Sequence, residues 1–273
     1  DTGINTGWWY DVDKGKWNYS FVHGASGGTY ESINGVGETN TVSMLNWSLG
    51  TIGGPYLFVT GASHRETPED VTNYIYRSRP GLPDVFDIAA DPPDFCIMPT
   101  KPIAIKSFKG RLYVWDRNNT YVVNQESLTI EDTYEGIGIL NEEAVVVTDF
   151  GMCFADSNNI YLHDGVRPKA IGTPILKNTL QKGWKIGYLQ QVKLAEEQGY
   201  KIKLFFDGDI HSFVITTKGF CQGTCEFWHT VKKGHRGYAY NVLYNRWDLW
   251  DVPDVIAISQ GREGSVLERT YRK

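Results

Sequence analysis

The residues best suited to bind a metal lie in one Gly-rich segment. Cys221, Cys225, His229 and His235 fall within fifteen residues of one another, and two thiolates with two imidazoles can hold a structural zinc ion. Only three residues separate Cys225 from His229, fewer than zinc fingers use. Zinc, a local disulfide and two unlinked thiols all stay open. We expect unlinked thiols, and hence no metal and no cofactor, and we expect the other two cysteines to be buried apolar residues: Cys96 and Cys153.

Three aspartates next to strand-like runs could do acid–base chemistry. Propeller glycosidases place a carboxylic acid and a carboxylate at the mouth of their channel, and Asp116, Asp149 and Asp164 are candidates for these positions. A hairpin Asp more often accepts hydrogen bonds from the N–H groups of its own turn. Such bonds lower the pKa of the carboxyl, whereas a general acid needs a raised pKa. We therefore predict no catalytic residue and no hydrolytic activity.

Other chemical motifs are weak. The Asp207-Gly208-Asp209 run resembles the start of a calcium loop but lacks the later ligands, so it predicts a type I′ hairpin turn. The run Gly24-Ala25-Ser26-Gly27-Gly28 has Gly-x-Ser-x-Gly spacing, but no helix is predicted after it, so it is expected to be a turn or loop and not a nucleophile elbow. There is no basic run with interleaved aromatics that would indicate nucleic-acid binding. Tryptophans could stack on sugars, although packing between blades is favoured; they are Trp8, Trp9, Trp247 and Trp250.

The composition indicates an all-β protein. The 273 residues include 29 Gly, 16 Tyr, 12 Phe and 9 Trp, and aromatic and Gly-rich chains without helical runs favour strands and tight turns. A run of about 18 apolar residues is absent, so no membrane-spanning helix is predicted. The chain begins at Asp1, and residues 255–272 resemble the first strands of an unfinished blade. We therefore expect a piece of a longer polypeptide.

The net charge of −5 is unevenly spread. Residues 1–150 carry −10, and residues 151–273 carry +5. This asymmetry is consistent with an electrostatic contact between subunits and also with ordinary scatter over a solvated surface.

Two segments near the ends of the chain share a pattern. Tyr10-Asp11-Val12 with Trp17, and Tyr240-Asn241-Val242 with Trp247, are displaced by 230 residues, and each predicts a hairpin. Between them, Tyr113 and Tyr161 each begin a Tyr-x-x-Asp run and are 48 residues apart. Five periods of 46 residues span the distance of 230, and roughly 40–50 residues form one propeller blade. We expect Trp17 and Trp247 to occupy equivalent blade positions.

Short strand-like runs cover most of the chain. A single helix-like run lies at residues 175–181, and the Pro-rich residues 81–99 predict an extended loop. Residues 217–236 predict an insertion between two strands of a blade. The fold expected is therefore one all-β domain over residues 1–273, a β-propeller of five or six blades. The expected strands are 41–47, 56–60, 73–77, 103–108, 111–115, 120–124, 144–148, 151–155, 160–163, 189–195, 201–206, 210–216, 237–243 and 247–251.

The insertion at residues 217–236 combines aromatic and cationic side chains, a composition enriched where proteins bind one another. It is the predicted partner-binding segment, and the residues expected to make contact are Phe220, Phe227, Trp228, Lys232, Lys233 and Arg236.

A family resemblance rests on residues 73–176. The run 74–83, with Ser78 before Pro80-Gly81-x-Pro83, and the runs 102–114 and 145–172 are similar to successive blades of propeller proteins in tailed-bacteriophage virions. The group they resemble is the nozzle, or tail tubular protein B. Nozzle proteins are usually longer, and their platform domain has no counterpart here. The resemblance implies a virion structural protein without catalytic residues.

The function expected from this resemblance is structural. Copies of the chain would form a homo-oligomeric ring around the DNA exit channel of the tail, contact other tail proteins and allow phage DNA to pass during ejection. Membranes would not be a partner. The alternative is a secreted propeller that binds or cleaves carbohydrate.

Overall fold

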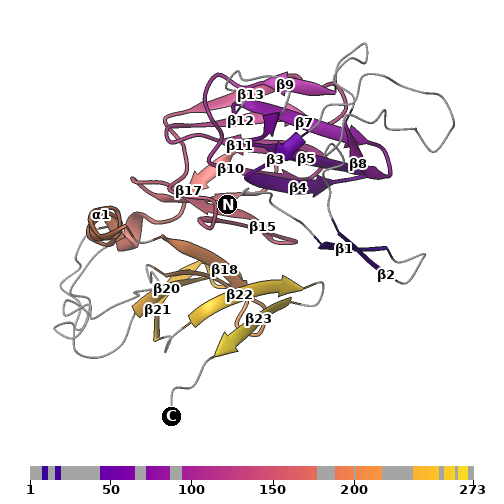
Figure 1. The fold of residues 1–273 in the computed structure, drawn as a ribbon. Coiled ribbons are helices and arrows are strands. Elements are labelled where there is room, and N and C mark those ends of the chain that lie inside the picture. Colours follow the sequence, from indigo (N-terminus) through magenta and orange to yellow (C-terminus); the bar gives the residue numbers. More distant parts are fainter. Residues whose placement is uncertain are drawn as a thin grey trace, which may run out of the picture. The chain divides into compact units, whose positions relative to one another are not determined.

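A computed structural model describes residues 8–11, 16–19, 44–64, 72–86, 94–176, 188–199, 201–216, 236–251, 255–261 and 264–269. The chain divides into two compact units, Asp1–Glu135 and Gly136–Lys273. Apart from one helix and one 3-10 turn, the regular elements of the described residues are all strands (Figure 1). This confirms the all-β prediction. No helix among them is long and apolar enough to cross a membrane.

The first unit contains two larger sheets. In one, β4 pairs with β5 and β5 with β7, while β8 and β9 pair with different parts of β7. The other has the simple order β10-β11-β12-β13. The strands are β1 (Trp8–Asp11), β2 (Lys16–Tyr19), β3 (Met44–Asn46), β4 (Leu49–Gly53), β5 (Tyr56–Thr60), β6 (Ser63–His64), β7 (Tyr74–Arg79), β8 (Leu82–Phe86), β9 (Phe95–Ile97), β10 (Ala104–Phe108), β11 (Arg111–Trp115), β12 (Asn119–Asn124) and β13 (Ile130–Glu135).

The second unit contains two four-stranded sheets and a hairpin. The sheets have the orders β14-β15-β16-β17 and β18-β19-β20-β21, and β22 pairs with β23. A 3-10 turn η1 (Thr173–Ile175) and a helix α1 (Tyr188–Gln198) precede β18. The strands are β14 (Val145–Thr148), β15 (Gly151–Ala155), β16 (Ile160–His163), β17 (Pro168–Ala170), β18 (Lys203–Asp207), β19 (Ser212–Thr216), β20 (Arg236–Asn241), β21 (Arg246–Asp251), β22 (Val255–Gly261) and β23 (Gly264–Arg269).

Each four-stranded sheet is an antiparallel meander in which strands adjacent in sequence are adjacent in space. This is the topology of a propeller blade, and the described part of the fold is propeller-like in this sense. Middle strands are buried along their length, with β15 and β19 buried at every position, whereas the last strand β13 is exposed at five of its six positions. Burial therefore falls toward the last strand.

The two sheets of the first unit share one apolar core. Phe58 and Ile75 of the first sheet pack with Leu112, Val114 and Val123 of the second. The opposite face of the first sheet is buried as well, by a cluster that includes Val59 and Tyr76. A strand buried on both faces reads as a continuous apolar run rather than an alternating one, which explains Leu57-Phe58-Val59 in β5.

Two successive sheets have turns of similar sequence between their second and third strands, and the distance between these turns gives the repeat of the two sheets. Asp116-Arg117-Asn118-Asn119-Thr120-Tyr121 joins β11 to β12, and Asp156-Ser157-Asn158-Asn159-Ile160-Tyr161 joins β15 to β16, an offset of 40 residues. In both turns the Asp N–H donates to the carbonyl of the second Asn, at 3.0 Å. Tyr113 and Tyr161 were predicted to be equivalent positions of two repeats. This prediction was wrong, because Tyr113 lies on the second strand of its sheet and Tyr161 lies on the third.

Both predicted hairpins at the ends of the chain are present, with the same register. The equivalent blade position of Trp17 and Trp247 stays a prediction, because among the described strands β1 and β2 pair only with each other. Tyr10 pairs with Trp17 in the β1–β2 hairpin, and Tyr240 pairs with Trp247 in the β20–β21 hairpin. Trp247 is half-buried, and its Nε1–H donates to the Ile171 carbonyl at 2.7 Å. The side chain of Trp17 lies outside the described residues.

The helix was predicted in the wrong place. Residues 189–195 were expected to form a strand, but they lie in α1. Tyr188, Val192 and Ala195 are buried, and their spacing of four and three places them on one helical face. Within the predicted helix at 175–181, the described residues hold only the end of η1.

The Pro-rich residues 81–99 are more regular than predicted. They contain β8 and β9, with residues 87–93 outside the described part. Pro83 lies in β8, which pairs with β7 at only two positions. Proline is tolerated in an edge strand because such a strand has N–H positions outside the ladder.

Arg77 connects the two sheets of the first unit. Its side chain is 12% exposed and pairs with Asp94, 13% exposed, at 2.5 Å from Nη2 to Oδ1. Its Nη1 also donates to the carbonyl oxygens of Gln125 and Glu126, and the guanidinium lies 5.0 Å from the centre of the Tyr56 ring. These contacts hold β7 against the loop that follows β12.

We expect Arg77→Met to lower the free energy of unfolding by about 3–5 kcal/mol, because it leaves the Asp94 carboxylate buried without its cation. The matched control is Arg111→Met. Arg111 pairs with Glu131 at 2.7 Å but is 50% exposed, so its loss should cost less than about 1 kcal/mol. Urea denaturation followed by tryptophan fluorescence measures both values. Equal losses would contradict the clamping role of Arg77.

Candidate functional site

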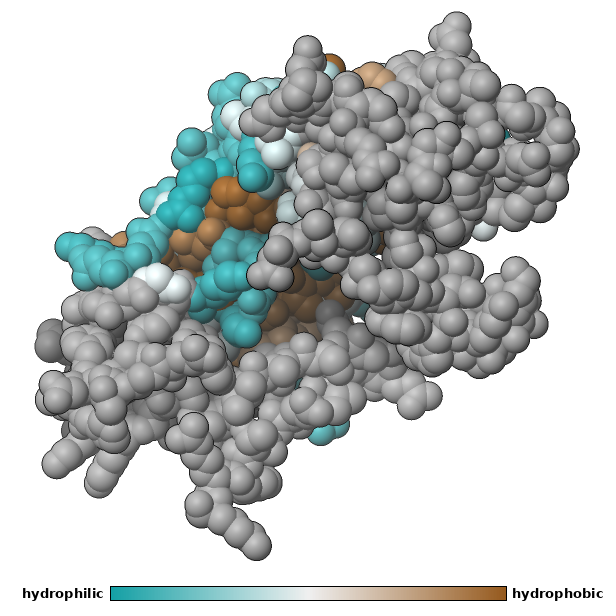
Figure 2. All heavy atoms as spheres, viewed as in Figure 1, coloured by the Kyte–Doolittle hydropathy of each residue, from teal (hydrophilic) through white to brown (hydrophobic). Residues whose placement is uncertain are grey.

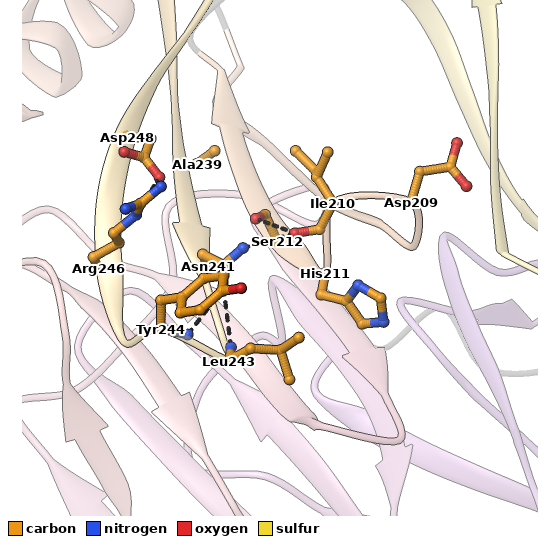
Figure 3. Close-up of a pocket in the computed structure, with 10 residues that line it drawn as sticks. All are labelled: Asp209, Ile210, His211, Ser212, Ala239, Asn241, Leu243, Tyr244, Arg246 and Asp248. Atoms are coloured by element: carbon orange, nitrogen blue, oxygen red, sulfur yellow. Dashed lines mark hydrogen bonds and ion pairs between the residues drawn. The ribbon is translucent and has the colours of Figure 1, made fainter.

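A pocket of about 420 Å³ lies at one end of the β18–β21 sheet. Its walls are two four-residue loops, 208–211 between β18 and β19 and 242–245 between β20 and β21 (Figure 3). Each loop ends in a residue with a left-handed backbone, His211 at φ 50° and Asn245 at φ 52°. The predicted two-residue type I′ turn after Phe206 was therefore wrong, since four residues separate the paired Asp207 and Ser212.

Asn241 ties the two loops together. Its Nδ2 donates to the Ile210 carbonyl of the other loop at 2.8 Å, and its Oδ1 accepts the N–H groups of Leu243 and Tyr244, both at 3.0 Å. The Ser212 hydroxyl also donates to the Ile210 carbonyl, at 3.0 Å. The loops are fixed by the protein before any ligand binds.

Large apolar side chains gather around this pocket. Tyr244 is 71% exposed, Leu243 59% and Ile210 41%. Beside them, the half-exposed Phe150 of the β14–β15 loop contacts the His211 ring edge-on, with 5.9 Å between ring centres. Figure 2 shows that apolar residues reach the surface elsewhere as well, among hydrophilic ones. A cluster of exposed apolar side chains at one place favours a binding surface.

Charged groups line one side of the pocket. The Arg246 Nε donates to Asp248 Oδ2 at 3.0 Å, and the Arg246 guanidinium lies 5.5 Å from the centre of the Tyr244 ring. Asp209 extends from the opposite loop. None of these residues was predicted as a site residue. The available signal was Asn241 at the end of a strand, the position from which its side chain can cap a loop.

Asp116 is a turn cap. It is 6% exposed, and its Oδ1 accepts the N–H groups of Asn118 and Asn119, both at 2.6 Å. Its Oδ2 accepts hydrogen bonds from the hydroxyls of Thr100, at 2.5 Å, and Tyr121, at 3.0 Å. Burial by itself would raise the pKa of Asp116, but these hydrogen bonds outweigh it and lower the pKa.

Asp164 also caps its own turn. It accepts the Val166 N–H at 3.0 Å and Lys169 Nζ at 2.9 Å, and these bonds lower its pKa to about 2. In the hairpin of Asp149 it is Thr148 that makes the turn bonds, accepting the Phe150 N–H and donating to the Gly151 carbonyl. Asp149 is exposed.

The three predicted carboxylates do not share one structural position. Asp116 lies in a loop between the second and third strands of its sheet, in the first unit. Asp149 and Asp164 follow the first and third strands of a sheet in the second unit. Because consecutive strands run in opposite directions, those two loops lie at the end of the sheet opposite to the Asp156 turn.

Asp156 is the repeat equivalent of Asp116 and was missed in the sequence. It is 2% exposed, and its Oδ1 accepts the N–H groups of Asn158 and Asn159 at 2.7 and 2.6 Å. Burial nevertheless raises the pKa of Asp156, offset only in part by these bonds and by the Tyr161 hydroxyl. A raised pKa suits a general acid, but a carboxyl enclosed to this degree cannot reach a substrate.

The predicted partner-binding insertion and the Cys/His segment lie outside the described residues, except that Arg236 begins β20. Of the other cysteines, Cys153 is buried as predicted, and Cys96 is half-buried. Within the described residues, no group of three or more His, Cys, Asp or Glu side chains could hold a metal ion.

Comparison with known proteins gives no family. No family model matches the chain, and no curated protein matches it. Among solved structures, the extracellular domain of a one-component system protein from B. thetaiotaomicron aligns at 10% identity and a TM-score of 0.45, over 88% of this chain. A structure of the mitotic checkpoint complex aligns at 7% identity and a TM-score of 0.39, over 91% of this chain and 71% of that one.

The chain spans about a quarter, 26%, of the B. thetaiotaomicron protein. At such low identity and TM-score, neither structure indicates what this chain does.

The two equivalent turns predict opposite responses to pH. The Asp116 pKa is lowered in the folded state, so the stability it contributes is present above its ordinary pKa of about 4 and is lost as the pH falls through the folded value. The Asp156 pKa is raised, so its contribution is greatest below pH of about 4 and is lost as the pH rises through the folded value.

We therefore expect Asp116→Asn to be less stable than wild type by about 1–3 kcal/mol at pH 7, with the difference shrinking in acid. Relative to wild type, Asp156→Asn should gain stability as the pH rises from about 4 to 7. Urea denaturation at several pH values measures both differences. The same pH trend in both variants would contradict the assignment.

Proposed function

We propose that this chain is a non-enzymatic structural component of a bacteriophage tail, of the nozzle or tail-tip type. The observation that carries the proposal is the motif series in residues 73–176. The residues that resemble nozzle blades form β7, then β10 and β11, then β14 to β17, and these lie in three successive sheets. The resemblance therefore follows the sheet order and is not scattered over unrelated elements.

In the proposed assembly the sheets are blades of one propeller domain with five or six blades. Copies of the chain form a ring around the DNA exit channel in the virion and contact other tail proteins. Turn-capping by Asp116 and Asp164 supports the non-enzymatic part of the proposal, because carboxyls with lowered pKa values are poor general acids.

Electron microscopy tests the function. Purified protein should assemble into rings, and antibodies against the chain should label the tails of virions. Monomers retained on an immobilised glycan, with virions unlabelled, would instead support the alternative, a secreted carbohydrate-binding propeller.

The insertion can be removed with a turn taken from the same chain. Residues 217–236 stand where the preceding sheet has only a short turn between its second and third strands, Asp156-Ser157-Asn158-Asn159. Substituting that four-residue turn for residues 217–236 leaves Thr216 opposite Gly237, in register with the pairing of Ile215 with Tyr238. We expect a folded monomer with an unchanged circular dichroism spectrum and impaired assembly into rings.

A matched control is Ser157→Arg, which converts the turn after β15 toward that after β11. It alters the surface of a turn without touching the insertion, so assembly should be normal. Rings formed normally by the insertion-replaced protein would refute the contact role of residues 217–236.

A further inference from the structure

The pocket at the end of the β18–β21 sheet is not used by the proposed structural role. Its two loops are joined by the Asn241 side chain, so its shape does not depend on a bound partner. A volume of about 420 Å³ lies within the range of sites for small ligands, and such sites combine apolar walls with a few fixed polar groups.

The apolar wall is unusually open to water. Tyr244 and Leu243 are 71% and 59% exposed, at the tip of a loop whose backbone is held by two hydrogen bonds to Asn241. One side of the Tyr244 ring faces the Arg246 guanidinium, 5.5 Å from the ring centre. The Arg246 guanidinium therefore covers one face of the Tyr244 ring, and the opposite face of the ring is the one that a ligand can contact.

The charges disfavour a simple anion as the ligand. Arg246 is paired with Asp248 at 3.0 Å, and Asp209 lies on the opposite loop with its carboxylate directed away from this pair (Figure 3). The two carboxylates disfavour a phosphate or another anion. Within the Arg246–Asp248 pair, the guanidinium offers hydrogen-bond donors beside the acceptor oxygens of Asp248. The favoured ligand is neutral and presents both donors and acceptors.

We infer that this pocket binds one ring of a neutral saccharide. A sugar ring has C–H groups on its face, which can pack on Tyr244, and hydroxyls around its edge, which can donate to Asp248 and accept from Arg246. The inference does not rest on the proposed tail function. Monomeric protein that binds sugar would support this inference and contradict the ring, whereas rings that bind no sugar would do the reverse.

The test is saturation-transfer NMR on the whole chain with three probes taken separately: maltotriose, N,N′-diacetylchitobiose and lactose. Wild type should bind at least one of them. Tyr244→Ala should weaken that binding at least about tenfold, and Tyr244→Phe, which keeps the ring, should stay within about twofold of wild type. Val166→Ala is the control, because Val166 is 77% exposed but lies between β16 and β17, outside the pocket lining.

Three results would overturn the inference. They are no transfer to any of the three sugars, sugar binding that Tyr244→Ala leaves unchanged, and binding of a tyrosine- or proline-rich peptide at this pocket in place of sugar. Circular dichroism of each variant establishes that it is folded.

Discussion

Burial of both faces of the middle strands is the constraint on which the rest of the described structure depends. β5, β11, β15 and β19 are buried at nearly every position, and a strand can be buried on both faces only when other elements cover its sheet on each side. In the first unit this cover comes from sheet-on-sheet packing around Phe58 and Leu112. The polar side chains that stabilise the fold through hydrogen bonds therefore lie mainly in the loops between strands.

The burial of the strands determines the role of the aspartates, which is to accept hydrogen bonds in the turns between them. Asp116 and Asp156 sit at the same point of a 40-residue repeat, each closing a tight turn between two buried strands. The N–H groups that they satisfy would otherwise be buried without partners, at a cost of about 1–3 kcal/mol each. Carboxylates committed in this way stabilise a scaffold. They are not poised for proton transfer to a substrate.

Apolar runs made most of the strands predictable. The predicted runs 56–60, 111–115, 151–155 and 160–163 coincide with β5, β11, β15 and β16, since each is a short apolar segment between turn residues. The helix α1 was not predicted because a short run of apolar residues such as Leu189, Val192 and Ala195 is also found in strands. Such a short run does not distinguish the helical period of about 3.6 residues from the strand period of about two. β8 was not predicted because Pro83 has no N–H to donate to a neighbouring strand, and its presence indicated a loop.

The pocket could not be predicted, for a related reason. Ile210 and Leu243 continue the apolar character of β19 and β20, so both were assigned to strands, and the predicted strands left only three residues in each loop, 207–209 and 244–246. The structure places both in four-residue loops, because Asp207 pairs with Ser212 and Asn241 with Arg246. The spacing of 48 residues between Tyr113 and Tyr161 likewise did not measure the repeat, since these tyrosines lie on the second and the third strands of their sheets.

We propose that the sheets are successive blades of one propeller that acts as a scaffold. Single-particle cryo-electron microscopy of the purified protein tests it most directly. The account predicts a density in which the β4–β9, β10–β13, β14–β17 and β18–β21 sheets surround one axis, in five or six blades, with several copies in a ring. Separate two-sheet sandwiches without a common axis, in a protein that stays monomeric, would contradict it.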